Sequence, residues 1–210
     1  MTERKDEILA AAIAIADERG LEAVSMRSVA DRVGVTPMAL YPYVGSKTAL
    51  LDAMYGRIVS EYVPAVPATA DWRERMRSLA TAARSLAKQR PWVVSLMLSR
   101  PSVVLDAVRV TDALYQALLD AGVPDADVPR MERLLSTFFL GYSASESGGR
   151  FGAASENLRG SRGQLPEGRL PGHARLAPWL DQVPDWDAEF EADLQDLEQL
   201  ILAKARPRPS

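Results

Sequence analysis

The sequence of 210 residues contains no cysteine and a single histidine. A chain without cysteine forms no disulfide and offers no thiolate to a metal ion, which fits the reducing cytoplasm. The sequence also lacks a glycine-rich phosphate loop, a nucleophile elbow and a His-x-x-x-His pair. These absences argue against an enzyme, and they give no indication of a metal or another cofactor.

Long apolar runs are missing too, and none approaches the roughly 20 residues that a membrane-spanning helix needs. The segment Ile8–Ala16 imitates the apolar core of a secretory signal, but the residues before it, MTERKDE, carry no excess of positive charge. Its apolar residues recur instead at helical spacing. We therefore expect a first amphipathic helix there, in a cytoplasmic protein without a signal peptide or a membrane anchor.

An overall excess of positive charge is absent, because 25 Lys and Arg stand against 28 Asp and Glu, a net charge of −3. This balance argues against a protein that coats nucleic acid without sequence preference. It leaves open a protein that reads a DNA sequence, since such a protein needs positive charge only locally. Residues 24–50 do have a local excess, with Arg27, Arg32 and Lys47 against Asp31.

Almost every periodic segment of the chain has the apolar spacing of an α-helix, and no segment alternates as a β-strand does. The predicted fold class is therefore all-α. Pro64 and Pro67 interrupt the pattern and mark a boundary between a domain of residues 1–63 and a second domain of residues 71–205. In the second domain, helix starts are predicted at Asp71, Pro91, Pro101, Asp127 and Asp185, and a helix end at Gly122.

The segment from Ser147 to Arg175 loses this periodicity. It contains seven of the 13 glycines of the chain. A stretch of this kind predicts a long irregular loop at 147–175, with helical order returning at Asp185.

Two short helices are predicted close together at residues 25–44. Ser25 is a suitable N-cap for the first, and Gly34 allows the left-handed conformation that ends it. Thr36 is the predicted N-cap of the second helix, with Pro37 in its first turn. Gly45 and Ser46 then separate this helix from a long one that begins at Lys47. This spacing is typical of a helix-turn-helix motif, whose second helix is presented outward to read DNA.

The second helix divides into an inner and an outer face. Leu40 and Val44 are expected to point into the core, while Met38, Tyr41 and Tyr43 are left outside or at the rim. An exposed methionine and two tyrosines are suited to contact thymine methyl groups, sugars and phosphates. The alternative is that the three helices are only a structural subdomain.

The segment GLEAVSMRSVADRVGVTPMALYPYVGSKTALLDAM resembles the DNA-binding domain of the TetR family of bacterial transcription regulators. The resemblance runs from about Lys5 to Tyr62. It implies base or backbone contacts in the major groove for Arg27 and for residues 36–38, and phosphate contacts for Tyr41 and Lys47. Pro42 departs from the family pattern because it removes an amide. The implied DNA-binding residues are Arg27, Thr36, Pro37, Met38, Tyr41, Tyr43 and Lys47.

The second domain has a looser resemblance, carried by RPWVVSLMLSRPS and the long helix after it, to the regulatory domain of tetracycline-repressor type. The resemblance implies an effector pocket. Ordinary core packing is the alternative role for each of its candidate residues. Tetracycline repressors use histidine and a magnesium-bound drug, and the single histidine, His173, lies in the glycine-rich segment, so no metal site is expected. The candidate pocket residues are Trp92, Met97, Asp112, Tyr115, Phe138 and Tyr142.

The resemblance implies a repressor that blocks a near-palindromic operator as a homodimer and is released by a small-molecule effector. We expect the apolar stripe Trp186–Ile201 and the face Met131–Tyr142 to form the dimer contact. The glycine-rich segment is interpreted as a spacer or as a flap over the pocket, and an arm that touches DNA is disfavoured. The alternative function is a helical protein-interaction module that does not bind DNA.

Overall fold

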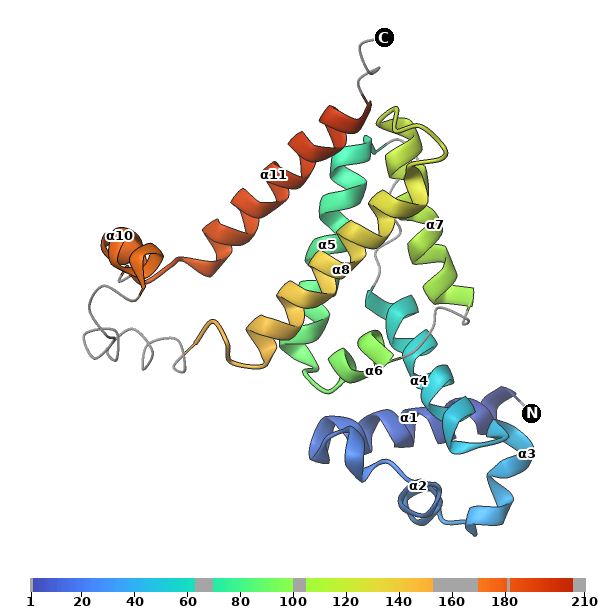
Figure 1. Ribbon diagram of the computed structural model, residues 1–210. Coiled ribbons are helices and arrows are strands. Elements are labelled where there is room, and N and C mark those ends of the chain that lie inside the picture. Colours follow the sequence, from blue (N-terminus) through green and yellow to red (C-terminus); the bar gives the residue numbers. More distant parts are fainter. Residues whose placement is uncertain (1, 63–69, 100–104, 153–169, 181, 206–210) are drawn as a thin grey trace.

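The computed structural model describes residues 2–62, 70–99, 105–152, 170–180 and 182–205. Within these ranges the chain forms α-helices and short 3-10 helices and has no β-strand (Figure 1), so the all-α prediction is confirmed. In the same ranges, no helix is both long enough and apolar enough to cross a membrane.

The N-terminal helices form a small core of their own at one end of the molecule (Figure 1). Ile8, Ala12, Val29, Leu40 and Met54 are completely buried in it. The elements of this part are α1 (Thr2–Arg19), η1 (Leu21–Ala23), α2 (Met26–Val33), η2 (Pro37–Ala39), α3 (Tyr41–Val44) and α4 (Lys47–Tyr62).

The C-terminal helices surround a second, larger core. Its buried side chains include Met76 of α5, Leu118 of α7, Leu135 of α8 and Leu194 of α11. The elements of this part are α5 (Trp72–Gln89), α6 (Val93–Ser99), α7 (Leu105–Asp120), α8 (Val128–Ser147), α10 (Pro171–Leu180) and α11 (Trp186–Ala205).

Helices α4 and α6 connect the two cores. Ile58 of α4 packs with Leu86 of α5 and Val93 of α6 in a third buried cluster. Leu96, further along α6, is buried in the N-terminal core. The short helix α6 therefore touches both parts of the molecule.

Most predicted helix ends have the expected capping interactions. The Asp71 carboxylate accepts a hydrogen bond from the Glu74 amide at 2.9 Å, and the Asp185 carboxylate accepts from the Asp187 amide at 3.0 Å. Gly122 has a φ of 85°, which favours glycine, and it lies just after the end of α7. These predicted helix boundaries are confirmed.

Three predictions about local structure need correction. Pro91 lies in a turn, and α6 begins two residues later, at Val93. The Asp127 side chain makes no capping hydrogen bond with α8 and pairs instead with Arg130 at 3.5 Å. The predicted loop 147–175 is wrong at its end, because α10 begins at Pro171; residues 153–169 of that loop and Pro101 lie outside the described residues.

The predicted dimer stripe is mostly buried within the chain itself. Phe190, Leu194 and Ile201 of α11 belong to the C-terminal core together with Met131 and Leu135 of α8. Ion pairs fix α11 on the same side, since Arg77 of α5 pairs with both Glu191 and Glu198. These apolar residues are therefore already covered by the chain and cannot serve as the contact between two copies.

Candidate DNA-binding surface and ligand cavity

The first helix of the motif has a complete capping box at its start. The Ser25 hydroxyl accepts a hydrogen bond from the Ser28 amide at 3.0 Å, and the Ser28 hydroxyl accepts from the Ser25 amide at 2.9 Å. Gly34 ends the helix with a φ of 72° and a ψ of 34°, a left-handed conformation in which glycine has no steric penalty. The sharp turn that follows α2 is thus dictated by local sequence, as predicted.

The second helix of the motif differs from the prediction. Pro37 does start a helical turn, but the Thr36 side chain makes no capping hydrogen bond, and the turn is a 3-10 helix that ends at Ala39. A separate α-helix of four residues follows at Tyr41. The reason is Pro42, which has no amide to donate to the residue 38 carbonyl, so one continuous α-helix from Pro37 to Val44 would lack a hydrogen bond at its centre.

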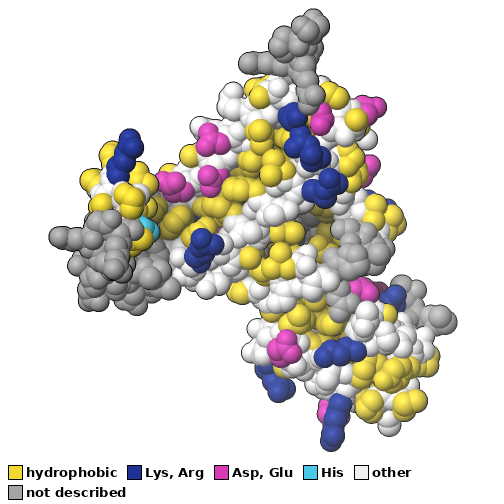
Figure 2. All heavy atoms as spheres, viewed as in Figure 1, with side chains coloured by type: hydrophobic (Ala, Val, Ile, Leu, Met, Phe, Trp, Pro, Cys, Tyr) yellow, Lys and Arg dark blue, Asp and Glu magenta, His cyan; other side chains and the backbone are white. Residues whose placement is uncertain are grey.

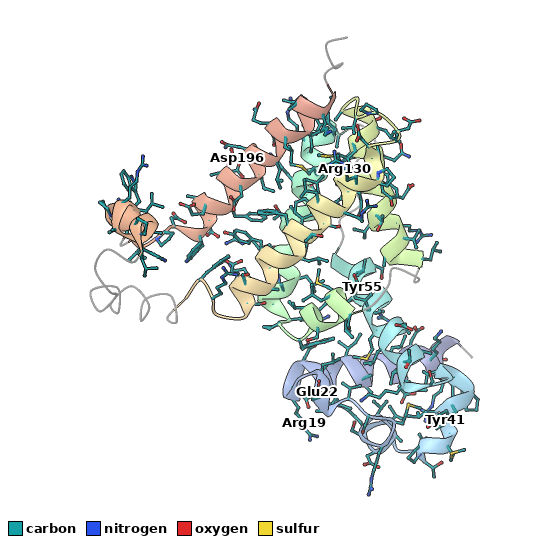
Figure 3. The ribbon with its side chains drawn as sticks, in the orientation of Figure 1. Arg19, Glu22, Tyr41, Tyr55, Arg130 and Asp196 are labelled. Carbon is teal, nitrogen blue, oxygen red and sulfur yellow. The ribbon has the colours of Figure 1, made fainter. Side chains whose placement is uncertain are left out.

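The divided helix nevertheless separates inner from outer side chains as expected. Leu40 and Val44 are buried, whereas Met38 is 74% exposed and Tyr41 is 42% exposed. Figure 3 shows Tyr41 on α3, at the end of the molecule remote from α11. Arg27, Thr36, Pro37 and Lys47 are exposed as well. Tyr43 is half-buried and packs against the N-terminal core, so less of it reaches solvent than of Tyr41.

The positive charge on this surface is smaller than the sequence indicates. Arg32 is held by Glu18 of α1, with hydrogen bonds of 2.7 and 2.5 Å to its two carboxylate oxygens. This hydrogen bonding lowers the pKa of Glu18. Among the described residues, neither Arg27 nor Lys47 has an acidic partner, and basic side chains project from this part of the molecule in Figure 2.

Lys47 begins α4, and Ser46 caps that helix by accepting a hydrogen bond from the Ala49 amide at 3.1 Å. The first turn of a helix attracts anions because its amides carry partial positive charge. A lysine at this position adds a full charge to the same place, so the start of α4 is well suited to a phosphate group.

A cavity of about 180 Å³ lies among α4, α5, α6, α7 and α8. Its walls are mainly apolar, with Leu79, Met97, Leu114 and Phe139 from four different helices. Four polar side chains also line it: Tyr55, Thr111, Glu132 and Ser136.

Tyr55 enters the cavity from α4, where that helix meets the C-terminal helices (Figure 3). Burial raises the pKa of its hydroxyl, as expected for a phenol taken out of water. Tyr55 was not among the residues predicted for the pocket, because its position on an apolar helix face is also typical of an ordinary core residue.

The structure does not bring the six predicted pocket residues together. Of these six residues, only Met97 lines the cavity. Asp112 is exposed, and Tyr115 packs on the outer side of the C-terminal core. The helical spacing of Glu132, Ser136, Phe139 and Leu140 was the available signal for one wall, because residues at i, i+4, i+7 and i+8 share a helix face.

Phe138 and Tyr142 lie in an aromatic cluster away from this cavity. The Tyr142 ring centroid is 4.9 Å from that of Phe190 and 5.0 Å from that of Phe151. Its hydroxyl donates a hydrogen bond to the Trp186 carbonyl at 2.9 Å, and burial raises its pKa to about 12. Tyr142 therefore attaches the start of α11 to α8.

Trp92 lies at the junction of the two parts of the molecule. Its indole N–H donates a hydrogen bond of 2.8 Å to the carboxylate of Asp17, near the end of α1. Arg90 also approaches that carboxylate, with Nε at 3.3 Å from Oδ1. Four residues after Trp92, Leu96 enters the N-terminal core, and the next residue, Met97, lines the cavity.

Larger depressions lie on the outer face of α5, next to α11. One of about 670 Å³ runs along Arg73, Arg77, Ser78 and Ser85, and another of about 490 Å³ adjoins Lys88. Both are open to solvent; the first lies along one face of α5, and the second has walls from α5 and α11. The smaller cavity has walls from five helices, which is the form that ligand sites between helices usually take.

Two family models match the chain in succession. Residues 8–54 match the model described as bacterial regulatory proteins, tetR family, and residues 64–201 match the tetracyclin repressor-like C-terminal domain. An HTH-type transcriptional regulator of Saccharopolyspora erythraea is 27% identical over 202 residues, which cover 92% of this chain and 82% of that protein. The HTH-type transcriptional repressor DrrR1 of Streptomyces coeruleorubidus is 31% identical over 143 residues, 67% of this chain and 53% of that protein.

Solved structures give the same result over nearly the whole chain. ActR of Streptomyces coelicolor in complex with actinorhodin superposes with a TM-score of 0.83 at 25% identity, covering 97% of this chain and 98% of ActR. Apo ActR superposes with a TM-score of 0.81 at 26% identity, with the same two coverages.

Proposed function

Because the chain belongs to the TetR family of bacterial regulatory proteins, which are DNA-binding transcription regulators, we propose that it is a repressor. As a homodimer it occludes a near-palindromic operator and releases it when a small molecule enters the cavity. The observation that supports this most is helix α6, which contacts the N-terminal core through Leu96 and the cavity through Met97. Family membership favours this function over an interaction module without DNA binding.

The outer face of the motif is the proposed reading surface. Arg27 and residues 36–38 contact bases or backbone in the major groove, and Tyr41 and Lys47 hold phosphates. The exposure of Met38 and Tyr41 supports these roles, since both side chains are available without rearrangement. Tyr43 is half-buried, so we assign it a contact with DNA through its exposed part and a role in supporting α3.

The proposed domains are residues 1–63 for DNA binding and 71–205 for regulation and dimerisation. Separate apolar cores in the two regions support this division.

The dimer contact that we propose uses the outer faces of α8 and α11. Leu134 is 45% exposed and Leu200 is 38% exposed, and the half-buried Phe138 and Leu197 lie one turn from them. The proposed contact is thus narrowed to the residues of the predicted stripe and face that keep exposed surface. A dimer would also place two reading helices about 34–36 Å apart, one turn of DNA.

Release by a small molecule is supported by a structural neighbour. ActR has been solved with actinorhodin and with (S)-DNPA, so a protein of this fold holds small molecules. We propose that the effector of this chain enters the cavity lined by Tyr55 and Met97.

The test is a gel-shift screen of duplex DNA that flanks the gene for this protein. We expect one near-palindromic fragment to bind, with an affinity that falls steeply as salt rises. Unrelated duplex of the same length is the control. The absence of salt-dependent binding to any flanking fragment would contradict the proposal.

A further inference from the structure

Glu132 is the charged residue among the described side chains that line the cavity. It lies on α8 and is half-buried. In the described part of the chain, no cation pairs with its carboxylate and no donor forms a hydrogen bond with it. An acidic group with these surroundings needs a partner when water leaves the cavity, because an isolated carboxylate is costly in an apolar environment.

Glu146, on the same helix as Glu132, differs from it in having cationic partners. Glu146 accepts hydrogen bonds of 2.7 and 2.6 Å from Arg84 and lies 3.3 Å from the Lys88 ammonium. Burial raises its pKa, but these hydrogen bonds outweigh burial and leave the pKa below its ordinary value. Glu146 is thus paired within the chain, as buried carboxylates usually are, whereas Glu132 is not.

Two of the three other polar groups of the cavity, Thr111 and Ser136, are available to a ligand as acceptors, while the Tyr55 hydroxyl keeps its hydrogen and can donate. The Thr111 hydroxyl donates to the Ala107 carbonyl at 3.3 Å, and the Ser136 hydroxyl donates to the Arg133 carbonyl at 3.4 Å. Each hydroxyl has then used its one hydrogen within its own helix and keeps only lone pairs for a ligand. Together with the Glu132 carboxylate, these two hydroxyls form a wall on α7 and α8 that favours donors and repels anions, and the Tyr55 hydroxyl on α4 can donate or accept.

The remaining walls are apolar and aromatic. Leu79, Met97 and Leu114 offer apolar surface, and Phe139 and Tyr55 add rings. Aromatic rings also attract cations through their π-systems. The volume of about 180 Å³ is close to that of cavities that hold a single benzene ring.

We propose that this cavity binds a compact organic cation, an aryl or alkyl amine whose ammonium pairs with Glu132 while its apolar body lies among Leu79, Leu114 and Phe139. The inference rests on the proposed function, because it takes the cavity to be the effector site. It adds the chemical class of the effector: an amine is accepted and a carboxylic acid of the same shape is rejected.

The test uses three probes that share one shape: 2-phenylethylamine, 2-phenylethanol and phenylacetate. Binding to the full chain is measured by calorimetry at pH 7, where the amine is protonated and the acid is ionised. We expect the amine to bind at least tenfold more tightly than the alcohol, and phenylacetate to bind most weakly. In Glu132→Gln the amine should lose at least tenfold and fall to the level of the alcohol.

Two controls separate this inference from the proposed function. Glu189→Gln removes an exposed carboxylate of α11, a helix that does not line the cavity, and should leave all three affinities unchanged. Ala83→Phe fills the cavity and should abolish binding of the amine and the alcohol alike.

Equal affinities for the amine and the alcohol, unaffected by Glu132→Gln but lost in Ala83→Phe, would overturn the ligand class and leave the cavity as the effector site. Binding that survives Ala83→Phe would overturn both. A failure of the amine to bind at all would overturn the ligand class, while the operator screen would still decide the repressor function.

Discussion

The two candidate functional regions of this molecule, the proposed reading surface and the cavity, are built in opposite ways. The reading surface uses residues close together in sequence, from Arg27 to Lys47, held by local turns and exposed on short helices. The cavity uses side chains from Tyr55 to Leu140, brought together by the packing of five helices. The first region is therefore specified by local capping, and the second by the long-range fit of helix faces.

Helix α6 is where these regions meet. Two consecutive residues of α6 contact different parts of the molecule: Leu96 belongs to the N-terminal core, and Met97 belongs to the cavity wall. A ligand that displaces Met97 would act on the DNA-binding part through one peptide unit. The four predictions below test this contrast, beginning with the largest expected effect.

Leu194→Ala should destabilise the C-terminal region strongly. The side chain is 1% exposed within the chain's own core, and removing a buried leucine costs about 2–5 kcal/mol. Urea denaturation at a fixed protein concentration measures the loss, which should appear as a lower midpoint with an unchanged slope.

The matched variant is Leu134→Glu with Leu200→Glu, which changes two exposed leucines of the proposed dimer contact. We expect a folded monomer by sedimentation, with little change in helix content. A double variant that stays dimeric would move the contact elsewhere, and an unchanged unfolding midpoint in Leu194→Ala would contradict the packing that we describe.

Arg27→Ala and Met38→Ala should relax base preference by about 1–3 kcal/mol at particular positions of the operator. Both side chains are exposed on the reading surface and stabilise no core, so the fold should be unaffected. Competition binding against a set of single-base operator variants measures the effect. An equal loss of affinity for every operator variant would show that neither residue reads bases.

The DNA-binding part and the cavity differ in how much of each could be predicted from the sequence. The ends of α2 follow from Ser25 and Gly34, whose caps need only neighbouring residues. Phe138 and Tyr142 have the same helical spacing as the residues of α8 that line the cavity, yet both belong to the aromatic cluster, in which Tyr142 contacts Phe190 of α11. Spacing identifies a helix face, but it does not say which neighbouring helix covers that face.

The interruption of the reading helix was only half predicted. Pro42 was recognised as a departure that removes an amide, but not as the cause of a 3-10 turn at Pro37–Ala39. The missing amide of Pro42 can be read from the sequence, but the 3-10 turn that forms in place of an α-helix cannot. The pairing of Arg32 could not be predicted from the sequence either. Its partner Glu18 is 14 residues away, and the ion pair neutralises a positive charge that the composition counts as available for DNA.

Lys47→Ala should reduce the free energy of binding to the operator and to unrelated DNA by a similar amount, about 1 kcal/mol, because phosphate contacts carry no sequence information. The slope of log affinity against log salt should fall by about one unit for each protomer bound. Titrations at several salt concentrations measure both. Lys204→Ala is the control, since Lys204 lies at the end of α11, and an unchanged slope in Lys47→Ala would remove it from the DNA contacts.

The smallest change in affinity is expected at Asp17, which joins the two regions. Its carboxylate accepts the Trp92 indole hydrogen bond at 2.8 Å and lies 3.3 Å from Arg90, but its side chain is 37% exposed. An exposed pair of this kind contributes about 0–1 kcal/mol to stability. Asp17→Asn should therefore leave the fold and operator affinity nearly unchanged while weakening the connection between α1 and α6.

That connection can be measured without knowing the effector, because coupling between two sites is reciprocal. If the cavity influences DNA binding through α6, operator binding must in turn alter hydrogen exchange in α6 (Val93–Ser99). We expect such a change in the wild type and a smaller one in Asp17→Asn, which loses the ion pair with Arg90 although its side-chain oxygen can still accept from Trp92. Asp6→Asn is the control, since Asp6 is also on α1 but pairs with Arg57 within the N-terminal part. If α6 responds to DNA equally in Asp17→Asn and in the wild type, the Asp17 contact does not transmit the signal, and the buried Leu96 becomes the remaining route.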